Sequence, residues 1–471
     1  MITFILSILL LIGGYAGYGY IVERVFGADA GRPTPAVEMA DGVDYVPMGW
    51  GKIFLIQFLN IAGLGPIFGA VMGAVYGPAA FLWIVFGSIF GGAAHDYLSG
   101  MMSARNKGMS LPELGGACLG NAFKQFMRGF AVLLMVLVGA VFIAGPSKLL
   151  AGLTPDVFGY TFWCVAIFIY YVVATMLPID KVIGRIYPAF GFALLFMAIG
   201  IGSMIIIRNA PVPEATPANL YNMHSRAEAF PIFPMLFISI ACGAVSGFHA
   251  TQSPLMARCL RNEKHGRRVF YGAMIAEGIV ALIWAAAAMS FFGSVGGLQE
   301  FLAANDNNAA AAVDSIARSW LGRAGGLLAI VGVIAAPITS GDTAFRSARL
   351  IVADFLGYPQ KPLLNRALIA LPLFAVGFVI LQMNFEALWR YFAWANQTLA
   401  AATLWVVTVY LYNEKKCFWI SLFPAIFMTM VVATYIAIAP EGFRLPPYAG
   451  YIAGGCVTMG ITAWLRFRIL L

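Results

Sequence analysis

Five ionisable side chains lie within long apolar stretches of the sequence: His95, Asp96, His249, Glu277 and Asp342. A charged group in a nonpolar surrounding is costly, and such groups in membrane segments usually serve the movement of ions or protons. His95, Asp96 and Glu277 are therefore candidates for a proton relay, and His249 is predicted to line a polar pathway. Two simpler interpretations stay open. His95 and Asp96 could cap a helix or meet the membrane surface, and Glu277 could hydrogen-bond a neighbouring helix.

Three side chains with hard oxygen atoms lie close together in the sequence: Thr339, Ser340 and Asp342. Small hard cations prefer oxygen ligands. With the main-chain carbonyls of Ala62 and Gly65, these residues predict a site that couples transport to a cation or a proton. Apart from such a cation, no metal or cofactor is expected.

The same segment has two other interpretations. Thr and Ser hydroxyls within a helix often bond to a carbonyl of their own helix, and Asp342 can pair with Arg346 one turn later. If Asp342 is buried without a cation partner, proton coupling becomes the better interpretation.

These groups need elements that can hold polar atoms inside a membrane, and an interrupted apolar run provides one. Residues 53–76 are apolar and numerous enough to cross a bilayer, but they include Gly63, Gly65 and Pro66. Proline removes a helical hydrogen bond, and glycine leaves the backbone free. Because main chain at membrane depth is tolerated only in protein or beside a cavity, this run predicts a broken helix at a binding site.

A second apolar run, which starts at Phe233, is interrupted at Gly243, Ser246 and Gly247. For either break alone, close helix packing by small residues is the alternative. Two breaks in corresponding positions are typical of transporters, and a half-helix N-terminus favours an anionic group such as a substrate carboxylate. The residues predicted to bind substrate are Gly63, Gly65, Gly243, Ser246, Gly247, His249, Asn396 and Gln397.

Composition excludes an ordinary soluble protein. Of the 471 residues, 61% are hydrophobic and 11% are charged, whereas about 25% are charged in soluble domains. We expect about thirteen helices within the lipid bilayer. The six cysteines show no spacing typical of disulfides or zinc sites. The net charge is +8, but the basic residues are scattered through loops, so we expect no nucleic-acid partner. The oligomeric state is not predicted.

Lysine and arginine fall in alternate loops, as expected from their enrichment in cytoplasmic loops. The cluster at residues 258–268, together with Lys181 and Arg185, belongs to this pattern. The pattern predicts an N-terminus outside the cell and a cytoplasmic C-terminus.

Several motifs resemble the signature of the carbon starvation protein A (CstA) family. The most specific is FISIACGAVSGFHA at residues 237–250, and others lie at 41–47, 61–66, 342–349 and 395–397. The resemblance implies an all-α polytopic transporter of the bacterial or archaeal inner membrane, which takes up peptides or pyruvate during nutrient limitation. It also implies the LeuT-like fold of the amino acid–polyamine–cation superfamily. That fold has two inverted five-helix repeats with discontinuous first helices, and it often holds sodium between the first break and the third helix of repeat two.

The apolar runs divide in agreement with this implied fold. Residues 1–49 would hold an extra helix and a loop, and residues 50–208 the first repeat. Residues 209–411 would hold a connecting loop and the second repeat, and residues 412–471 two further helices. An odd number of crossings between the breaks gives the repeats opposite orientations.

The sequence therefore predicts a secondary active transporter that imports small peptides, or a related small carboxylate, together with H⁺ or Na⁺. A pyruvate–proton symporter is the nearest alternative, and a membrane nutrient sensor is a remote one. An enzyme is not expected, because the sequence lacks the short motifs of zinc hydrolases, serine hydrolases and nucleotide-binding loops.

Overall fold

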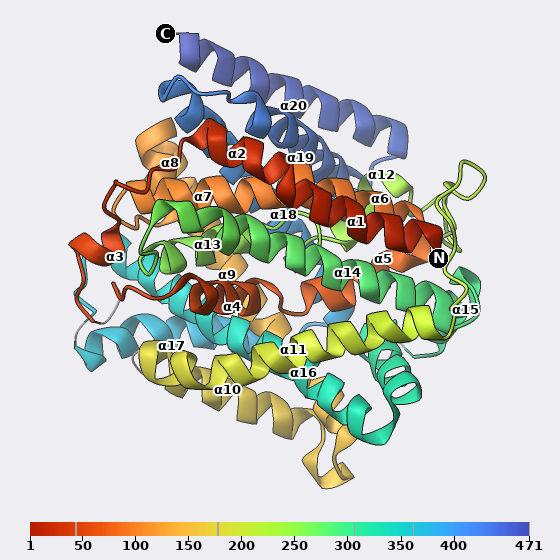
Figure 1. The fold of residues 1–471 in the computed structure, drawn as a ribbon. Coiled ribbons are helices and arrows are strands. Elements are labelled where there is room, and N and C mark those ends of the chain that lie inside the picture. The colour runs from red at the N-terminus through yellow and green to blue at the C-terminus, as the bar shows by residue number, and fades with distance from the viewer. Residues whose placement is uncertain (43–44, 177–178, 306, 361, 471) are drawn as a thin grey trace.

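A computed structural model describes residues 1–42, 45–176, 179–305, 307–360 and 362–470. Part of the motif at 41–47 and the side chains of Lys181 and Arg185 lie outside the described residues. The described chain is helical, and its β-structure is an isolated bridge between Met48 and Leu260. Figure 1 shows the helices lying side by side, with α20 (Pro447–Leu470) along one side of the bundle and α10 (Tyr160–Met176) along the other. The predicted all-α architecture is confirmed.

Eight helices of the described chain are long and apolar enough to cross a membrane, or nine if one bent pair counts as a single span. Among them are α9 (Asn121–Leu153), α14 (Gly272–Phe291) and α19 (Trp419–Ile438). The expected total of about thirteen is not confirmed and stays a prediction. The division at residues 49, 208 and 411 into inverted repeats is likewise still a prediction.

The first predicted break is present in the bent pair. Helix α4 (Trp50–Ile61) ends before Ala62, and the chain then continues through a π-helical turn, η1 (Gly65–Gly69), into α5 (Ala70–Gly73). The two parts meet at 57°. Pro66 lies at the start of the second part, where its missing N–H leaves no intrahelical bond unmade.

The second predicted break lies between α12 (Ile232–Ser239) and α13 (Gly247–Ala257). The two interruptions are in direct contact. A Cβ atom added to Gly243 would lie 3.6 Å from the Cα atom of Pro66, and one added to Gly65 would overlap the Cys242 side chain. Small residues at both breaks therefore allow the two main chains to meet inside the protein.

Several helices surround these breaks. Helix α14 is central in Figure 1 and packs against α1 (Ile2–Ala16), α4 and α6 (Ala79–Phe86). Helix α16 (Ala309–Leu356) packs against α9 and α4, and it changes direction at Gly322, whose φ of 67° is accessible to glycine. The part of α16 before this bend begins at Ala309.

Two short helices were not evident from the apolar runs. They are α8 (Leu111–Leu119), which packs on α9, and α15 (Val295–Ala304), which packs on α14. Both lie in segments whose polar residues suggest loops. A helix of about ten residues has fewer than three turns, so its periodicity is too short to identify it in the sequence.

Candidate functional site

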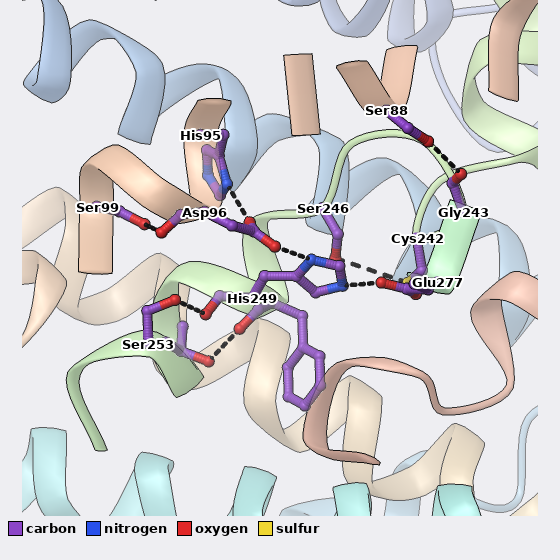
Figure 2. A network of polar contacts seen from close by, with 12 residues as sticks. Ser88, His95, Asp96, Ser99, Cys242, Gly243, Ser246, His249, Ser253 and Glu277 are labelled. Atoms are coloured by element: carbon purple, nitrogen blue, oxygen red, sulfur yellow. Dashed lines mark hydrogen bonds and ion pairs between the residues drawn. The ribbon is translucent and has the colours of Figure 1, made fainter. Parts of the chain in front are cut away.

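Four ionisable side chains form a continuous chain of contacts in the protein interior (Figure 2). Asp96 Oδ1 lies 2.8 Å from His95 Nδ1, and Asp96 Oδ2 lies 2.8 Å from His249 Nδ1. The other ring nitrogen of His249, Nε2, lies 3.3 Å from Glu277 Oε2. All four side chains are fully buried. The chain joins α7 (Ala93–Arg105), α13 and α14, and His249 lies two residues after the start of α13.

The contact between His249 and Glu277 is compatible with one proton shared between the two side chains. Asp96 is best satisfied when His249 donates its Nδ1 proton, which leaves Nε2 of a neutral ring as an acceptor. A contact with Glu277 is then favourable only if the carboxyl carries a proton. If the proton is on Nε2 instead, the ring is cationic and Glu277 is ionised. Both states hold one proton in the same contact, so the arrangement is suited to proton transfer.

Close main-chain approach positions this network. The π-helical turn η3 (Gly87–Gly92) leads into α7, and a Cβ atom on Gly92 would overlap the carbonyl of Ala244 at the second break. Ser99 and Ser253 hydroxyls donate to the main-chain oxygens of Asp96 and His249, at 3.3 and 3.0 Å, and so hold the two helical turns that carry these side chains.

A position at the membrane surface, one of the interpretations left open for His95 and Asp96, does not agree with their burial. Both side chains are fully buried, in the first turn of α7. The structure brings together all of the proton-relay candidates, His95, Asp96 and Glu277, and joins them through His249.

Neighbouring side chains bond to several polar main-chain groups of the second break. Trp83 Nε1 donates to the Ile240 carbonyl at 3.0 Å, and Ser88 Oγ donates to the Gly243 carbonyl at 3.1 Å. Asn396 Oδ1 accepts bonds from Ser246 Oγ at 3.1 Å and from the Phe248 N–H at 2.7 Å. This half-helix N-terminus therefore has a capping group of its own in the described state.

Two further predicted residues help to close the second break. Gly247 lies against the main chain of α18 (Phe385–Asn413) near Asn396, without room for a side chain. Gln397 Nε2 donates to the Phe237 carbonyl at 3.3 Å. Both Asn396 and Gln397 thus bridge helices in this structure, and their predicted role in substrate binding stays a prediction.

The three oxygen-bearing residues of α16 do not converge on one point. Ser340 Oγ lies 3.0 Å from the Leu59 carbonyl in the last turn of α4, and Gly63 is close to the same hydroxyl. Thr339 Oγ1 donates to the Ala336 carbonyl of its own helix at 2.7 Å. Asp342 is turned toward Arg346, whose Nη2 is 3.8 Å away and also donates to the Ala174 carbonyl of α10.

Ser340 and Asp342 are two positions apart in the sequence, so their side chains lie on opposite sides of the helix. The helix therefore presents Ser340, but not Asp342, to the first break. Hydroxyl bonding within α16 and the Asp342–Arg346 pair are the alternatives anticipated for this segment. In the described structure Gly65 packs beside Cys242, and the turn η1 that begins at Gly65 contacts α14.

Two candidate residues that the motifs do not mark are Gln57 and Asn60, near the end of α4. Both side chains are buried, and none of their four polar atoms has a hydrogen-bond partner among the described residues. The sequence shows two amides three residues apart in an apolar run, and this spacing could have marked them as candidates. Only the packing shows that they lack hydrogen-bond partners among the described residues.

Clefts approach the two breaks from opposite ends of the bundle. One, of about 110 Å³, is lined by residues that include Met72, Ser239, His224 and Arg390. Burial and the neighbouring Arg226 lower the pKa of His224. The other is smaller, with a volume of about 30 Å³, and its lining includes Thr251 of α13.

Comparison with known proteins agrees with this architecture. The family model described as carbon starvation protein CstA matches residues 1–158, 156–321 and 319–436. The chain belongs to the carbon starvation protein CstA family. An uncharacterized membrane protein of Haemophilus influenzae is 43% identical over 64% of this chain and 95% of its own length.

Relatives with named functions in this family are transporters. The peptide transporter CstA of Campylobacter jejuni is 26% identical, over 97% of this chain and 83% of its own. The pyruvate/proton symporter BtsT of Escherichia coli is 28% identical, over 56% of this chain and 45% of its own. These relationships support a multi-pass membrane transporter rather than an enzyme.

The fold also resembles that of a solved transporter. The crystal structure of a manganese transporter of Eremococcus coleocola superposes with a TM-score of 0.55 and 13% identity, covering 92% of this chain and 99% of the other. At this identity the likeness concerns the fold alone, and it extends over nearly the whole CstA-family chain.

Proposed function

We propose that this protein is a secondary active transporter that imports small peptides across the cytoplasmic membrane together with protons. The observation that carries the proposal is the buried contact between His249 and Glu277, at 3.3 Å, directly beside the second broken helix. Peptide transport is the function named for several CstA-family relatives. A proton held between two helices that meet at a binding site is a direct means of coupling.

Proton binding would change the charge of the dry network. With one proton shared by His249 and Glu277, and with neutral His95, the four groups carry one net negative charge. His95 Nε2 has no hydrogen-bond partner among the described residues and can accept a second proton, which makes the network neutral. Because an uncompensated charge is costly in a dry interior, loading this proton favours the closed arrangement of α7, α13 and α14.

Alternating access would then move the two broken helices against their neighbours. We assign the cleft lined by His224 and Arg390 to the outside and the cleft that reaches Thr251 to the cytoplasm, in keeping with the distribution of basic loops. The N-terminus is then outside and the C-terminus cytoplasmic. Two inverted repeats of the LeuT type, with the breaks in their first helices, would provide the required symmetry.

A pyruvate–proton symporter is the second candidate, since one relative of the family carries that name. The same proton network would serve it. Sodium coupling is a further proposal, in which Ser340 Oγ and the Leu59 carbonyl, 3.0 Å apart, contribute oxygen atoms beside the first break. In this arrangement Asp342 would not bind the ion directly, because it pairs with Arg346 instead.

Uptake by the purified protein in proteoliposomes would test these proposals. Labelled dialanine or pyruvate would be supplied with an inward pH gradient, with an inward sodium gradient, or with neither. We expect accumulation of dialanine with the pH gradient alone. Accumulation driven only by sodium would contradict proton coupling, and failure to transport either compound under any gradient would contradict the proposed function.

A further inference from the structure

The strongest unexplained feature of the interior is the pair of amide side chains at the end of α4. Gln57 is fully buried and Asn60 is 1% exposed. The carbonyl oxygen and the amide nitrogen of both side chains lack hydrogen-bond partners among the described residues. Leaving one such group unsatisfied costs an appreciable part of the total stability of a folded protein. Four of them close together therefore need a reason.

A neighbouring amide shows that this region can satisfy such groups when their role is structural. Asn396 is also fully buried, but its oxygen accepts two bonds at the second break and its nitrogen contacts Cys242 Sγ at 3.3 Å. The two amides of α4 have nothing comparable. Their polar atoms are thus available to a bound molecule.

The two amides lie close to the first break. Gln57 and Asn60 are one turn apart, so they share a face of α4, and α4 ends one residue after Asn60. Leu55 and Leu59 lie on another face, against Gly191 of α11 (Ile179–Ile207). Helix α4 also packs against α13 and α16, which carry the polar groups beside the two breaks.

A third unpartnered oxygen belongs to Gln252 on α13. This side chain is fully buried, and its nitrogen contacts Thr251 Oγ1 at 3.0 Å and Ser347 Oγ of α16 at 3.4 Å, whereas its oxygen has no partner among the described atoms. A helix that packs on α4 therefore carries another buried neutral acceptor without a partner among the described atoms.

The chemistry of these groups selects a ligand. An amide side chain offers one acceptor and one donor group, without charge. A carboxylate only accepts hydrogen bonds, so pyruvate would leave both side-chain carbonyl oxygens unsatisfied. A peptide bond presents a carbonyl and an N–H together, and it can bond to a donor and an acceptor at once.

We propose that Gln57 and Asn60 form a subsite that binds the peptide bond of the substrate, and that they make the protein selective for small peptides over keto acids. This inference rests on the proposed transport function and names the substrate class at the same site. The subsite lies in the last turn of α4, so a bound peptide would contact the first break.

Equilibrium binding to the purified full chain tests the subsite without any gradient. Labelled dialanine is the ligand, pyruvate is the competitor, and Gln57→Met and Asn60→Leu remove the polar atoms while keeping similar shapes. We expect dialanine to bind about five- to tenfold more weakly to each variant, since a lost hydrogen bond of ordinary strength is worth a factor of this size. The unfolding temperature should rise, because unsatisfied buried groups have been removed.

Gln382→Met is the matched control, because Gln382 is an exposed amide near the end of an apolar helix, α17 (Leu363–Ile380). It should bind dialanine as the unaltered protein does. Alanyl-sarcosine, whose peptide nitrogen carries a methyl group instead of hydrogen, adds a test that a structural role would not affect. It should bind more weakly than dialanine to the unaltered protein, and the difference should shrink in Gln57→Met or Asn60→Leu.

Three results would overturn the subsite: dialanine affinity unchanged in both variants, pyruvate bound in preference to dialanine by the unaltered protein, or an alanyl-sarcosine penalty that persists in both variants. If either replacement prevents folding, Gln57→Asn and Asn60→Gln keep the amide and shift it by one methylene, and they should weaken dialanine binding in the same sense. Dialanine binding that depends on both amides, without uptake under any gradient, would contradict the proposed transport function and leave the subsite standing.

Discussion

His249 Nε2 lies 3.3 Å from Glu277 Oε2 across the interface between α13 and α14, in a fully buried position. On its other side the same imidazole contacts Asp96, which also holds His95 (Figure 2). A single ring therefore connects the helix that follows the second break to two neighbouring helices. Loss or gain of one proton at this ring changes the interactions of all three.

Replacing Glu277 by Gln should separate coupling from transport. Gln can donate a hydrogen bond to His249 Nε2, so the contact and the fold are expected to survive, but it cannot take up a proton. We expect accumulation driven by a pH gradient to fall at least about tenfold, while exchange of labelled for unlabelled substrate without a gradient continues. Glu300→Gln in α15, which is exposed, is the control. Undiminished accumulation in Glu277→Gln would show that this carboxyl does not couple transport.

Trp83→Phe should destabilise the second break. The Trp83 ring packs against Phe237, with centroids 4.8 Å apart, and Phe can keep this contact. The Ile240 carbonyl, however, loses the indole N–H that lies 3.0 Å from it. We expect a loss of about 1–3 kcal/mol in the free energy of unfolding, because a buried carbonyl is left without its donor.

Denaturant unfolding in detergent would measure the loss, and hydrogen exchange should show faster opening at residues 240–246. Trp419→Phe, at an exposed aromatic residue, is the control. Equal stability of Trp83→Phe and the unaltered protein would mean that this carbonyl finds another donor.

Both breaks could be predicted from the sequence because glycine and proline have local effects on the backbone that do not depend on the fold. The ionisable residues could also be found one by one, since each stands out in an apolar run. Their convergence could not be predicted, because Asp96 and His249 are joined only by the packing of α7 on α13. The hydrogen bond from the Phe248 N–H to Asn396 could not be predicted from the sequence for the same reason.

The predicted cation site stays a prediction, and helical geometry bears on its ligand set. Ser340 and Asp342 are close in sequence, but two positions along a helix turn a side chain by about 200°. Helical periodicity therefore directs the two side chains to different sides of α16. The structure places Ser340 beside Leu59 and Asp342 beside Arg346, on the two sides expected from that rotation.

Gly65→Ala should prevent the two breaks from meeting. A Cβ atom at residue 65 would overlap the side chain of Cys242. Overpacking of this kind typically costs about 1–3 kcal/mol, and we expect a lower unfolding temperature and slower uptake. Combining Gly65→Ala with Cys242→Gly removes the overlapping atoms and should restore part of the stability.

Gly129→Ala, in α9, is the matched control for this substitution, since no atom lies within 4 Å of a Cβ built there. It should be neutral or slightly stabilising, because alanine favours a helix over glycine. If Gly65→Ala were as stable as Gly129→Ala, the contact between the breaks would not be essential.

The pairing of α8 with α9 should make stability depend on acid pH. Glu113 of α8 contacts both Lys124 and Arg128 of α9. Burial acts to raise the pKa of Glu113, but the hydrogen bonds and charges of Lys124 and Arg128 outweigh it and hold the pKa below its ordinary value. Since the folded protein binds this proton less readily than the unfolded chain, the ion pairs stabilise the fold fully above the unfolded pKa of about 4.3. The stabilisation is lost as the pH falls through the lower folded pKa.

Unfolding temperatures of the unaltered protein and Glu113→Gln, measured from pH 7 to pH 3, should therefore differ most near neutrality and converge in acid. Glu38→Gln, at an exposed residue of α3 (Pro35–Glu38), should show a much smaller difference at every pH. A gap between Glu113→Gln and the unaltered protein that widens toward pH 3 would contradict this assignment, because it would require Glu113 to stabilise the fold in its protonated form.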